Sequence, residues 1–574
     1  MGAASPSVRM GARPGNVPAT SAGGKAVYPG WGMDGARLHS REHGVAPERW
    51  CITRQDLVFL RGELDAAVRD GRIAPTDRDP FDPNDRTIGP CMYNVVETYI
   101  KPLTANAGGM SWALMRHPEG LKCDMFLTHC WAEGAFEFID KVLASWRRGC
   151  RGAWCCILAL PQNLDIGGLI HEPRDSPFAA ALRSASHVMV VPTCKASIYS
   201  RIWCIFEAHL AVERDSVVFT AAPPLRLCEL RTILAVPVIT GLGLAAGVWD
   251  VTRRYLFWAS RNFTLVLSVC FLMSLALNAR NHAGLYINAL GWFVGAAAIG
   301  RVCVWSRLAL ERQWTRVALW LVFYAYFVVT EVGRVQCIAE SQMSAELTNG
   351  YTSVTEAHAS VPADKVRILS DIGSNVQSVE EEIGVLIASG MSTPTLRSVA
   401  RKGVDVRGAA YWTAGMLIMG FGPWTTFWAF ATTGDSYVGA CAWRGENHCP
   451  VGLMTLGFSV VAALCILSSL FIFVRAEVDD RAFIVSSISK ITCFAWFFWY
   501  FCFSTADIFA SSHRRSQSPS TSWKEWWNVE AWLMLAVSPL NLLCAVLGRG
   551  GLVRAPVGGP ALVRLLGGPA LVRV

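Results

Sequence analysis

One short stretch of the chain combines residue types that could carry out chemistry. Residues 200–207 read Ser-Arg-Ile-Trp-Cys-Ile-Phe-Glu, which places a single carboxylate, Glu207, four residues after Trp203. The apolar segment 204–213 predicts a helix, so Glu207 would lie near its first turn. A carboxylate there is stabilised in its ionised form by the positive end of the helix dipole. Glu207 is therefore the first candidate for a functional group.

The residues upstream of this stretch predict the element that would position it. Residues 185–193 form a continuous apolar run typical of a buried parallel strand, and Pro192 ends the run. Residues 197–200 are polar and predict a loop after that strand. Because α/β folds place their sites at the carboxyl ends of parallel strands, we expect Glu207 to follow a site-forming loop.

The pattern Ser-x-x-Trp-Cys-x-x-Glu at residues 200–207 resembles a motif of the TIR (Toll/interleukin-1 receptor) domain family. Residues 124–134, Asp-Met-Phe-Leu-Thr-His-Cys-Trp-Ala-Glu-Gly, are similar to the family's first strand and loop. The resemblance covers roughly residues 122–224 and implies a flavodoxin-like α/β domain, a parallel sheet with flanking helices. The further strands would be 154–160, 188–191 and 217–220, and the helices 136–146 and 178–184.

The resemblance also implies a function. In the NAD-cleaving members of the family the matching glutamate is catalytic, so Glu207 would stabilise the developing oxocarbenium ion or orient the ribose hydroxyls. NAD would then be the substrate, and the loops after the first two strands would hold it. The candidate ligand-binding residues in those loops are Thr128, His129, Trp131 and Asn163, with Asp165 and Gly167 as further candidates to line the site.

Other interpretations of the same residues stay open. Signalling members of the family carry Trp-Cys-x-x-Glu without turnover, so the domain could be a scaffold that associates with other copies. Asn163 could belong to a solvated loop, and His129 could be a buried structural histidine. His129 and Cys130 with Cys155 and Cys156 could imitate a metal site, but the spacing is not that of a zinc motif. We expect buried free thiols and no metal there.

Composition bounds the class of protein. The chain has 574 residues, 23 tryptophans and a mean hydropathy of +0.32. These values predict two to four units, including a polytopic membrane part. The net charge of +8 is spread along the chain without a compact basic patch, which argues against a nucleic-acid partner. The 19 cysteines lack C-x-x-C pairs, which is typical of a reducing cytosol.

The residues before the TIR-like segment have a different character. Residues 1–45 are rich in Gly, Ala, Pro and Ser, and we expect them to be disordered. Residues 46–121 are predicted to form one amphipathic helix, at 56–68, and a linker rich in Asp and Pro, at 77–90. Residues 92–120 are either an extra layer on the TIR-like domain or a connector to it.

From residue 232 onward the chain is strongly apolar and predicts an all-α polytopic transmembrane domain. A first group of about four spans would occupy residues 232–332 and a second group 410–547, with the TIR-like domain in the cytosol. The first run contains Pro237 and three glycines, so it could fail to span. The eight candidate spans are 232–249, 262–277, 283–300, 317–332, 410–431, 453–474, 482–503 and 531–547.

Residues 333–409 separate the two groups as a helical loop. Apolar residues repeat there at intervals of three and four, which predicts an amphipathic stripe at 369–386. The stripe would serve either self-association or packing against the protein itself. The tail, residues 548–574, is low-complexity sequence for which we expect no fold.

Lys490 lies near the middle of an apolar run, where an ionisable group is costly and therefore a functional candidate, with Glu331 as its candidate partner. We expect an integral, multi-pass membrane protein that signals through TIR-like self-association, with NAD cleavage as a candidate second activity. The alternative is a channel or transporter whose TIR-like cytosolic domain is regulatory.

Overall fold

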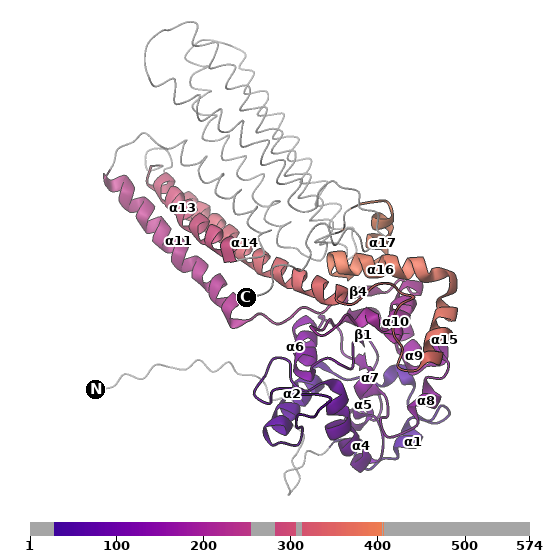
Figure 1. The fold of residues 1–574 in the computed structure, drawn as a ribbon. Helices are drawn as coiled ribbons and strands as arrows, with labels where there is room; N and C mark the ends of the chain where they lie inside the picture. The colour runs from indigo at the N-terminus through magenta and orange to yellow at the C-terminus, as the bar shows by residue number, and fades with distance from the viewer. Residues whose placement is uncertain (1–27, 254–281, 306–312, 405, 407–574) are drawn as a thin grey trace, which may run out of the picture. The chain divides into compact units, whose positions relative to one another are not determined.

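The structure is a computed structural model that describes residues 28–253, 282–305, 313–404 and 406 (Figure 1). The chain divides into two compact units, each described here by itself. The first comprises Met1–Lys195 and Val361–Asp371, and the second comprises Ala196–Ser360 and Ile372–Val574. Five predicted spans, 262–277, 410–431, 453–474, 482–503 and 531–547, and the tail, 548–574, lie outside the described residues.

Five strands form a mostly parallel sheet with flanking helices, which confirms the predicted α/β class. The strand order is β2-β1-β3-β4-β5. β1 pairs in parallel with both β2 and β3, whereas the short β5 pairs antiparallel with β4. The strands are β1 (Met125–Thr128), β2 (Ala153–Cys155), β3 (His187–Val190), β4 (Val217–Thr220) and β5 (Met391–Ser392).

β1 lies at the centre of the first unit, and its four residues are all buried. Phe126 of β1 stacks on Trp154 of β2 with 5.1 Å between ring centroids, so the two strands share a core. The register pairs Leu127 with Cys155. The residues that follow β1 and β2 therefore emerge at the same edge of the sheet, because parallel strands end on the same side.

Two helices of the first unit lie where the sequence predicts them: α6 (Ala135–Ser145) and α9 (Pro177–Ser184). The predicted second strand, 154–160, is wrong over most of its length. β2 ends at Cys155, and Cys156–Ala159 form a helical turn, α7, closed by the Leu160 N–H donating to the Cys156 carbonyl. A short apolar run does not distinguish a buried strand from a buried helical turn, and here the turn is formed.

Residues 28–121 form an additional layer on this unit. α2 packs against α6, the 3-10 helix η1 packs against α9, and α5 packs against α7. Residues 28–45, which the sequence predicts to be disordered together with 1–27, are folded here. The layer consists of α1 (Gly35–Leu38), η1 (Pro47–Arg49), α2 (Arg54–Arg69), α3 (Met92–Val95), the π-helical η2 (Val96–Ile100), α4 (Lys101–Ala107) and α5 (Trp112–Arg116).

The same layer covers the edge of the sheet. Ile52 and Ala153 exchange two backbone hydrogen bonds, of 2.9 and 2.8 Å, so the N-terminal segment continues the sheet beyond β2. The Trp154 indole N–H donates to the Pro47 carbonyl at 3.1 Å. An edge strand presents unpaired backbone groups to other chains, and this pairing satisfies part of that edge.

Asp56 holds the additional layer together. Its carboxylate is 2% exposed and accepts hydrogen bonds from the Thr53 backbone N–H and hydroxyl, at 2.8 and 2.7 Å. Arg116 Nε donates to it at 2.9 Å, and His117 Nε2 lies 2.6 Å from it. Burial alone would raise the pKa of Asp56, but the bonds from His117 and Thr53 lower it far below its usual value. One buried anion thus joins the start of α2 to the end of α5.

We expect Asp56→Asn to destabilise the protein by about 3 kcal/mol, because the buried carboxylate that pairs with the partly buried Arg116 would be lost. Chemical denaturation of the purified chain measures this. Asp70→Asn is the matched control, since Asp70 pairs with Arg72 at the surface, and it should change stability by no more than about 0.5 kcal/mol. Equal effects of the two substitutions would contradict the assigned role of Asp56.

The second unit contains α10 (Ile202–Glu213), which packs against α16 (Val376–Ser389). The stripe predicted at 369–386 is not one continuous helix. α15 (Pro362–Ile372) is followed by the 3-10 helix η6 (Gly373–Asn375). Gly373 has a φ of +50°, which interrupts the α-helical path. Val379, Ile383 and Leu386 of α16 are fully buried, so this half of the stripe packs inside the protein. α17 (Pro394–Arg401) follows.

Three long helices complete the described part of the second unit: α11 (Leu227–Arg253), α13 (His282–Trp305) and α14 (Gln313–Thr348). Among the described residues one segment, Leu227–Trp249, is long and apolar enough to cross a membrane. α11 continues through Pro237, so the run 232–249, which could fail to span by its Pro237 and glycines, is helical throughout. The predicted spans 283–300 and 317–332 lie within α13 and α14.

Small residues bring α11 and α13 close together. A methyl group at Gly247 would lie 2.0 Å from the Ala297 carbonyl oxygen, and one at Gly243 would lie 2.3 Å from the Phe293 carbonyl oxygen. The two glycines are four residues apart, the G-x-x-x-G spacing that lets helices approach closely in membranes. Glycine at both positions is therefore a requirement of this contact.

Gly247→Leu should separate α11 from α13 and lower the stability of the detergent-solubilised chain by about 2 kcal/mol. The new side chain would clash with the backbone carbonyl of Ala297, which cannot move aside as a flexible side chain could. Thermal unfolding followed by circular dichroism measures this loss of stability. Gly241 lies on the same helix with open space around its Cα, so Gly241→Leu is the control and should be tolerated. If Gly247→Leu melts like the control, the close contact does not exist.

Candidate functional site

Four side chains meet at the carboxyl edge of β1 and β2, entirely within the first unit. His129 follows β1, and Cys155 and Cys156 end β2 and begin α7. His129 Nδ1 lies 2.7 Å from Glu133 Oε1, and Nε2 lies 3.1 Å from Cys156 Sγ and 3.7 Å from Cys155 Sγ. All four residues are buried. We call His129, Glu133, Cys155 and Cys156 the thiol–imidazole cluster.

Backbone pairing holds the loop that carries His129 and Glu133. The Met92 N–H donates to the Glu133 carbonyl at 3.1 Å, and the Phe136 N–H donates to the Ile88 carbonyl at 3.0 Å. A methyl group at Gly134 would lie 2.2 Å from the Ile88 carbonyl oxygen, so a side chain there would separate the two segments. The predicted Asp- and Pro-rich linker thus ends in a segment that fixes the site loop.

Electrostatics inside the cluster depend on burial. Burial alone would lower the pKa of His129, but Cys156, Cys155 and Glu133 together raise it well above 6.5. Burial raises the pKa of Glu133 to about 7 against the opposing charge of His129, and burial raises the pKa of Cys155. The Nδ1–Oε1 distance of 2.7 Å is that of a charge-assisted hydrogen bond, so the protonation of His129 and that of Glu133 are linked.

The predicted ligand-binding residues make contacts within the first unit. Thr128 is the last residue of β1 and is 2% exposed, and His129 belongs to the thiol–imidazole cluster. Trp131 packs against Tyr93, with 5.3 Å between ring centroids. The Asn163 amide donates to the Lys101 carbonyl at 3.0 Å and to the Thr104 hydroxyl at 2.8 Å, so it is bound to α4.

The loop that the resemblance places over a ligand contains short helices of its own. Asp165 caps α8 (Ile166–Leu169) through the Gly168 N–H, and η3 (Pro173–Asp175) follows. α15 binds this loop: Arg367 donates to the His171 carbonyl, and Arg174 pairs with Asp371. The loop is therefore tied to a helix from far along the chain.

Glu207 lies in the second unit, on α10. The helix begins at Ile202, two residues earlier than predicted, so Glu207 is its sixth residue and not part of its first turn. The helix-dipole argument for its ionisation is therefore wrong, because the effect falls off within the first turn. Glu207 is 6% exposed, and Cys204 on the same helix is 4% exposed. The Trp203 ring packs edge-on against Phe206.

A second buried carboxyl, Glu382 of α16, lies in the same unit as Glu207. It is 1% exposed, and neither of its oxygens has a hydrogen-bond partner among the described residues. Burial, with a smaller contribution from Asp215, raises the pKa of Glu382 to about 8 against the opposing charge of Arg397. Tyr199 is also buried, which raises its pKa, and Glu382 adds to that effect. Glu382 is thus neutral at pH 7.

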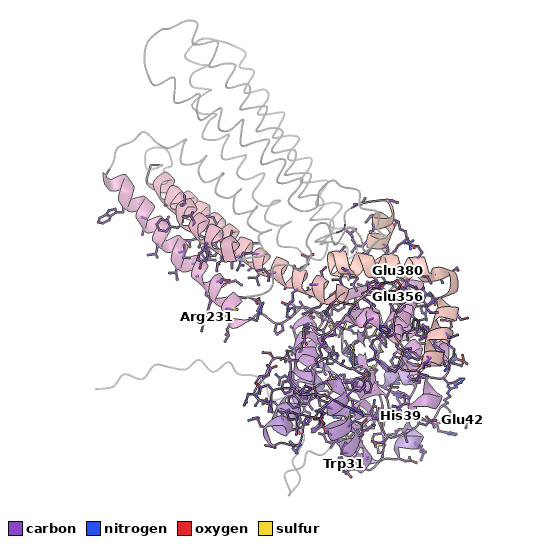
Figure 2. All side chains as sticks on the ribbon, in the orientation of Figure 1. Trp31, His39, Glu42, Arg231, Glu356 and Glu380 are labelled. Carbon is purple, nitrogen blue, oxygen red and sulfur yellow. The ribbon has the colours of Figure 1, made fainter. Side chains whose placement is uncertain are left out.

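By contrast, both carboxylate oxygens of its neighbour Glu380 (Figure 2) accept hydrogen bonds. The Tyr351 hydroxyl donates to Glu380 Oε2 and the Val354 N–H donates to Oε1, both at 2.6 Å. Arg397 donates to Asp215 at 3.0 Å and acts on Glu382 through its charge, without a hydrogen bond to either Glu382 oxygen in the described part of the chain. The carboxyls of α16 therefore differ sharply in how well they are satisfied.

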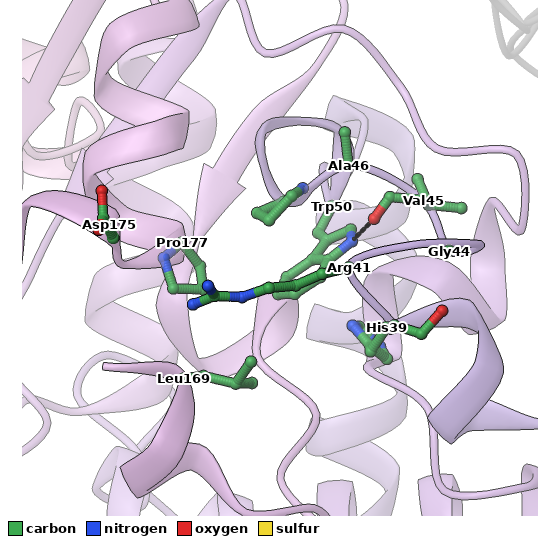
Figure 3. A pocket seen from close by; sticks show the side chains of 11 residues that line it. His39, Arg41, Gly44, Val45, Ala46, Trp50, Leu169, Asp175 and Pro177 are labelled. Carbon is green, nitrogen blue, oxygen red and sulfur yellow. Dashed lines mark hydrogen bonds between the residues drawn. The ribbon is translucent and has the colours of Figure 1, made fainter. Parts of the chain in front are cut away.

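A pocket of about 280 Å³ opens elsewhere in the first unit, between the N-terminal layer and α8 and α9 (Figure 3). Ser111 N–H donates to His39 Nε2 at 3.0 Å, and burial lowers the pKa of His39 to about 3, so this ring is neutral. The Arg41 side chain extends across the pocket toward Pro177. None of the predicted site residues lines it. The lining includes His39, Arg41, Trp50, Leu169, Asp175 and Pro177.

No family model, no curated protein and no solved structure matches this chain. In the described part of the chain, no three His, Cys, Asp or Glu side chains are arranged to hold a metal ion. Lys490 lies outside the described residues. Its predicted partner Glu331 binds Arg334, at 2.6 and 2.9 Å, and lies 3.4 Å from the Asn288 amide.

Sequence reasoning found part of the thiol–imidazole cluster and missed the rest. The sequence grouped His129 with Cys155 and Cys156 by residue type, as a possible imitation of a metal site. The predicted strand 154–160 would have placed the two cysteines at its start, whereas the observed β2 ends at Cys155. Glu133 was missed, although it lies four residues after His129 in the same loop. Nothing in the sequence marks Glu382 as a site residue. Its carboxyl lacks a hydrogen bond in the described part of the chain because Arg397 binds Asp215, and the sequence does not reveal that choice.

Glu382 predicts a specific pH dependence of stability. Its folded pKa is above its unfolded value, so folding binds a proton between pH 4.5 and 8, and stability falls as pH rises through that window. We expect Glu382→Gln to remove this loss, which reaches up to about 4 kcal/mol between pH 5 and 8. Chemical denaturation at both pH values measures it. Glu381→Gln, which removes a partly exposed partner of Arg401, is the control and should behave as the unsubstituted protein does.

Proposed function

We propose that this chain is a membrane-anchored signalling protein whose TIR-like α/β domain acts through association with other copies. The domain would lie in the cytosol, and the apolar helices would hold it at a multi-span membrane anchor. No nucleic acid is needed for this role. NAD cleavage at Glu207 is the second candidate activity.

The order of the sheet supports the TIR-like part of the proposal. The order β2-β1-β3-β4-β5 is that of flavodoxin-like folds. The Ser-x-x-Trp-Cys-x-x-Glu motif enters α10, between β3 and β4, as the resemblance implies. Fold alone does not define function, so the choice between assembly and catalysis rests on the site residues.

The observation that carries the choice is that His129 and Asn163, two of the residues assigned to nucleotide binding, already make hydrogen bonds within the protein. His129 binds Glu133 and Cys156, and Asn163 binds α4. Arg367 and Asp371 of α15 also tie down the loop that would close over a ligand. Binding NAD would have to break these contacts, whereas association through the surface of the domain would leave them in place. This favours assembly over turnover.

The anchor is supported by helix composition and packing. The segment Leu227–Trp249 has the length and apolarity of a span. The glycine-mediated contact of α11 with α13 is of a kind that membrane helices use. These observations favour a bilayer as the partner of this part of the chain.

The test compares association and NAD turnover in the purified full chain. We expect oligomers in detergent or lipid nanodiscs by light scattering, and no release of nicotinamide from NAD. Glu207→Gln should leave the oligomers unchanged, because it keeps the shape of the side chain. A monomer at all concentrations would rule out the proposal.

Nicotinamide release would show the second candidate activity if it disappears in Glu207→Gln. Glu213→Gln is the matched control, because Glu213 lies on the same helix but is partly exposed and binds His209 at 3.2 Å. Loss of turnover in both variants would indicate damage to α10 and would remove Glu207 as the catalytic residue.

A channel or transporter with a regulatory TIR-like domain is the remaining alternative. It is favoured by the buried pair of Glu331 and Arg334 on α14, beside Asn288 of α13. Ionisable groups within apolar helices often mark a path for ions or substrates. Here the two charges neutralise each other one helical turn apart, which also suits a purely structural role.

A further inference from the structure

Two buried cysteines of the first unit have nearly the same exposure but opposite surroundings. Cys156 is 6% exposed and lies 3.1 Å from His129 Nε2. Cys91 is 7% exposed, and its backbone N–H donates to Asp79. Burial raises the pKa of Cys91, and the Asp79 carboxylate raises it further. The reactivity of a cysteine depends on its thiolate, so these two thiols should differ strongly.

We propose that Cys156 is an activated thiol that small hydroperoxides oxidise, with His129 as its acid–base partner and Glu133 as a positioning residue. Glu133 accepts the Nδ1 proton at 2.7 Å, which directs Nε2 and its proton toward the sulfur. A protonated imidazole at 3.1 Å favours the thiolate form of a cysteine. The arrangement has the order carboxylate, imidazole, thiol that activates nucleophiles in other folds.

The geometry selects Cys156 over Cys155. Cys155 is 1% exposed and lies farther from Nε2, at 3.7 Å, and burial raises its pKa. Cys156 has both the shorter contact and the larger exposed fraction. Because only 6% of the residue is exposed, a small reagent such as hydrogen peroxide suits it best.

The reaction balances with the groups present and one peroxide. The Cys156 thiolate attacks one peroxide oxygen, an S–O bond forms and the O–O bond breaks. Sulfur loses two electrons to the peroxide, and the leaving hydroxide takes the Nε2 proton of His129 to become water. The products are a sulfenic acid on Cys156, a neutral imidazole and water. The step removes the charge pair between the sulfur and the ring.

Oxidation of Cys156 would also change the loop at residues 129–133. Glu133 would face a neutral ring after oxidation, while its own pKa is already raised to about 7 by burial. It would then be protonated more readily, and the hydrogen bond that holds residues 129–133 would weaken. Cys156 oxidation would thus act on the loop after β1, independently of whether the domain cleaves NAD.

The experiment treats the purified full chain with hydrogen peroxide in the presence of a dimedone probe and follows each cysteine by mass spectrometry. We expect Cys156 to be labelled at least about tenfold faster than Cys91 at pH 7. The comparison within one protein needs no variant. The exposed Cys194, which lies beside Glu137, shows how much exposure alone contributes.

Two further measurements separate activation from exposure. Between pH 6 and 8 the Cys156 rate should depend less steeply on pH than the Cys91 rate, because the His129 imidazole lies 3.1 Å from the Cys156 sulfur whereas the Asp79 carboxylate lies near Cys91. In His129→Gln the Cys156 rate should fall at least about tenfold. The ionisable groups around the ring whose states this profile reports are Cys155, Cys156 and Glu133, with Glu137 and Lys141 next to Glu133.

Equal labelling of Cys156 and Cys91 would overturn the proposal. So would labelling of Cys194 with none at Cys156, because the buried sulfur would then be inaccessible. A Cys156 rate that is unchanged in folded His129→Gln protein would remove the imidazole as the activating group. If that variant does not fold, the comparison of Cys156 with Cys91 and the pH profile still decide the outcome.

Discussion

The rest of the first unit depends on the complete burial of β1. A parallel strand buried on both faces needs a neighbour on each side and a layer of helices above and below. β2 and β3 supply the neighbours, and α6 supplies part of one layer. Residues 28–121 supply further cover and continue the sheet beyond β2 through Ile52. The TIR-like segment by itself would leave that edge unpaired.

Burying so much of the chain leaves several charged groups away from water, and they are satisfied to different degrees. Asp56 accepts hydrogen bonds on both oxygens and stays ionised. His129 and Glu133 form a hydrogen bond of 2.7 Å beside two sulfurs. Glu382 has no partner in the described part of the chain and stays protonated. Satisfied anions fix the fold, and the incompletely satisfied groups are those whose charge can change near neutral pH.

Sequence patterns predicted the elements whose cause is local. α2, α6, α9, β3 and β4 follow from apolar periodicity and turn residues, and the α/β class follows from their order. Errors arose where tertiary contacts decide: the turn α7 replaced a strand, and Gly373 interrupted the predicted stripe. The site residues were predicted by type, but their engagement with neighbours was not, because Asn163 and Trp131 are bound by segments about 40 to 60 residues away.

The assignment of Val361–Asp371 to the first unit has a consequence for how this protein can be divided. The polypeptide leaves the first unit at residue 195, returns as α15, and leaves again after residue 371. No single cut can release that unit intact, because its last helix is encoded beyond the apolar helices α11 to α14. A shortened gene ending near residue 224 would express a domain without α15, and the 161–176 loop would lose its contacts with Arg367 and Asp371. Ligand binding or turnover measured on such a fragment would describe the loop without these two contacts rather than the loop as it is held in the whole chain.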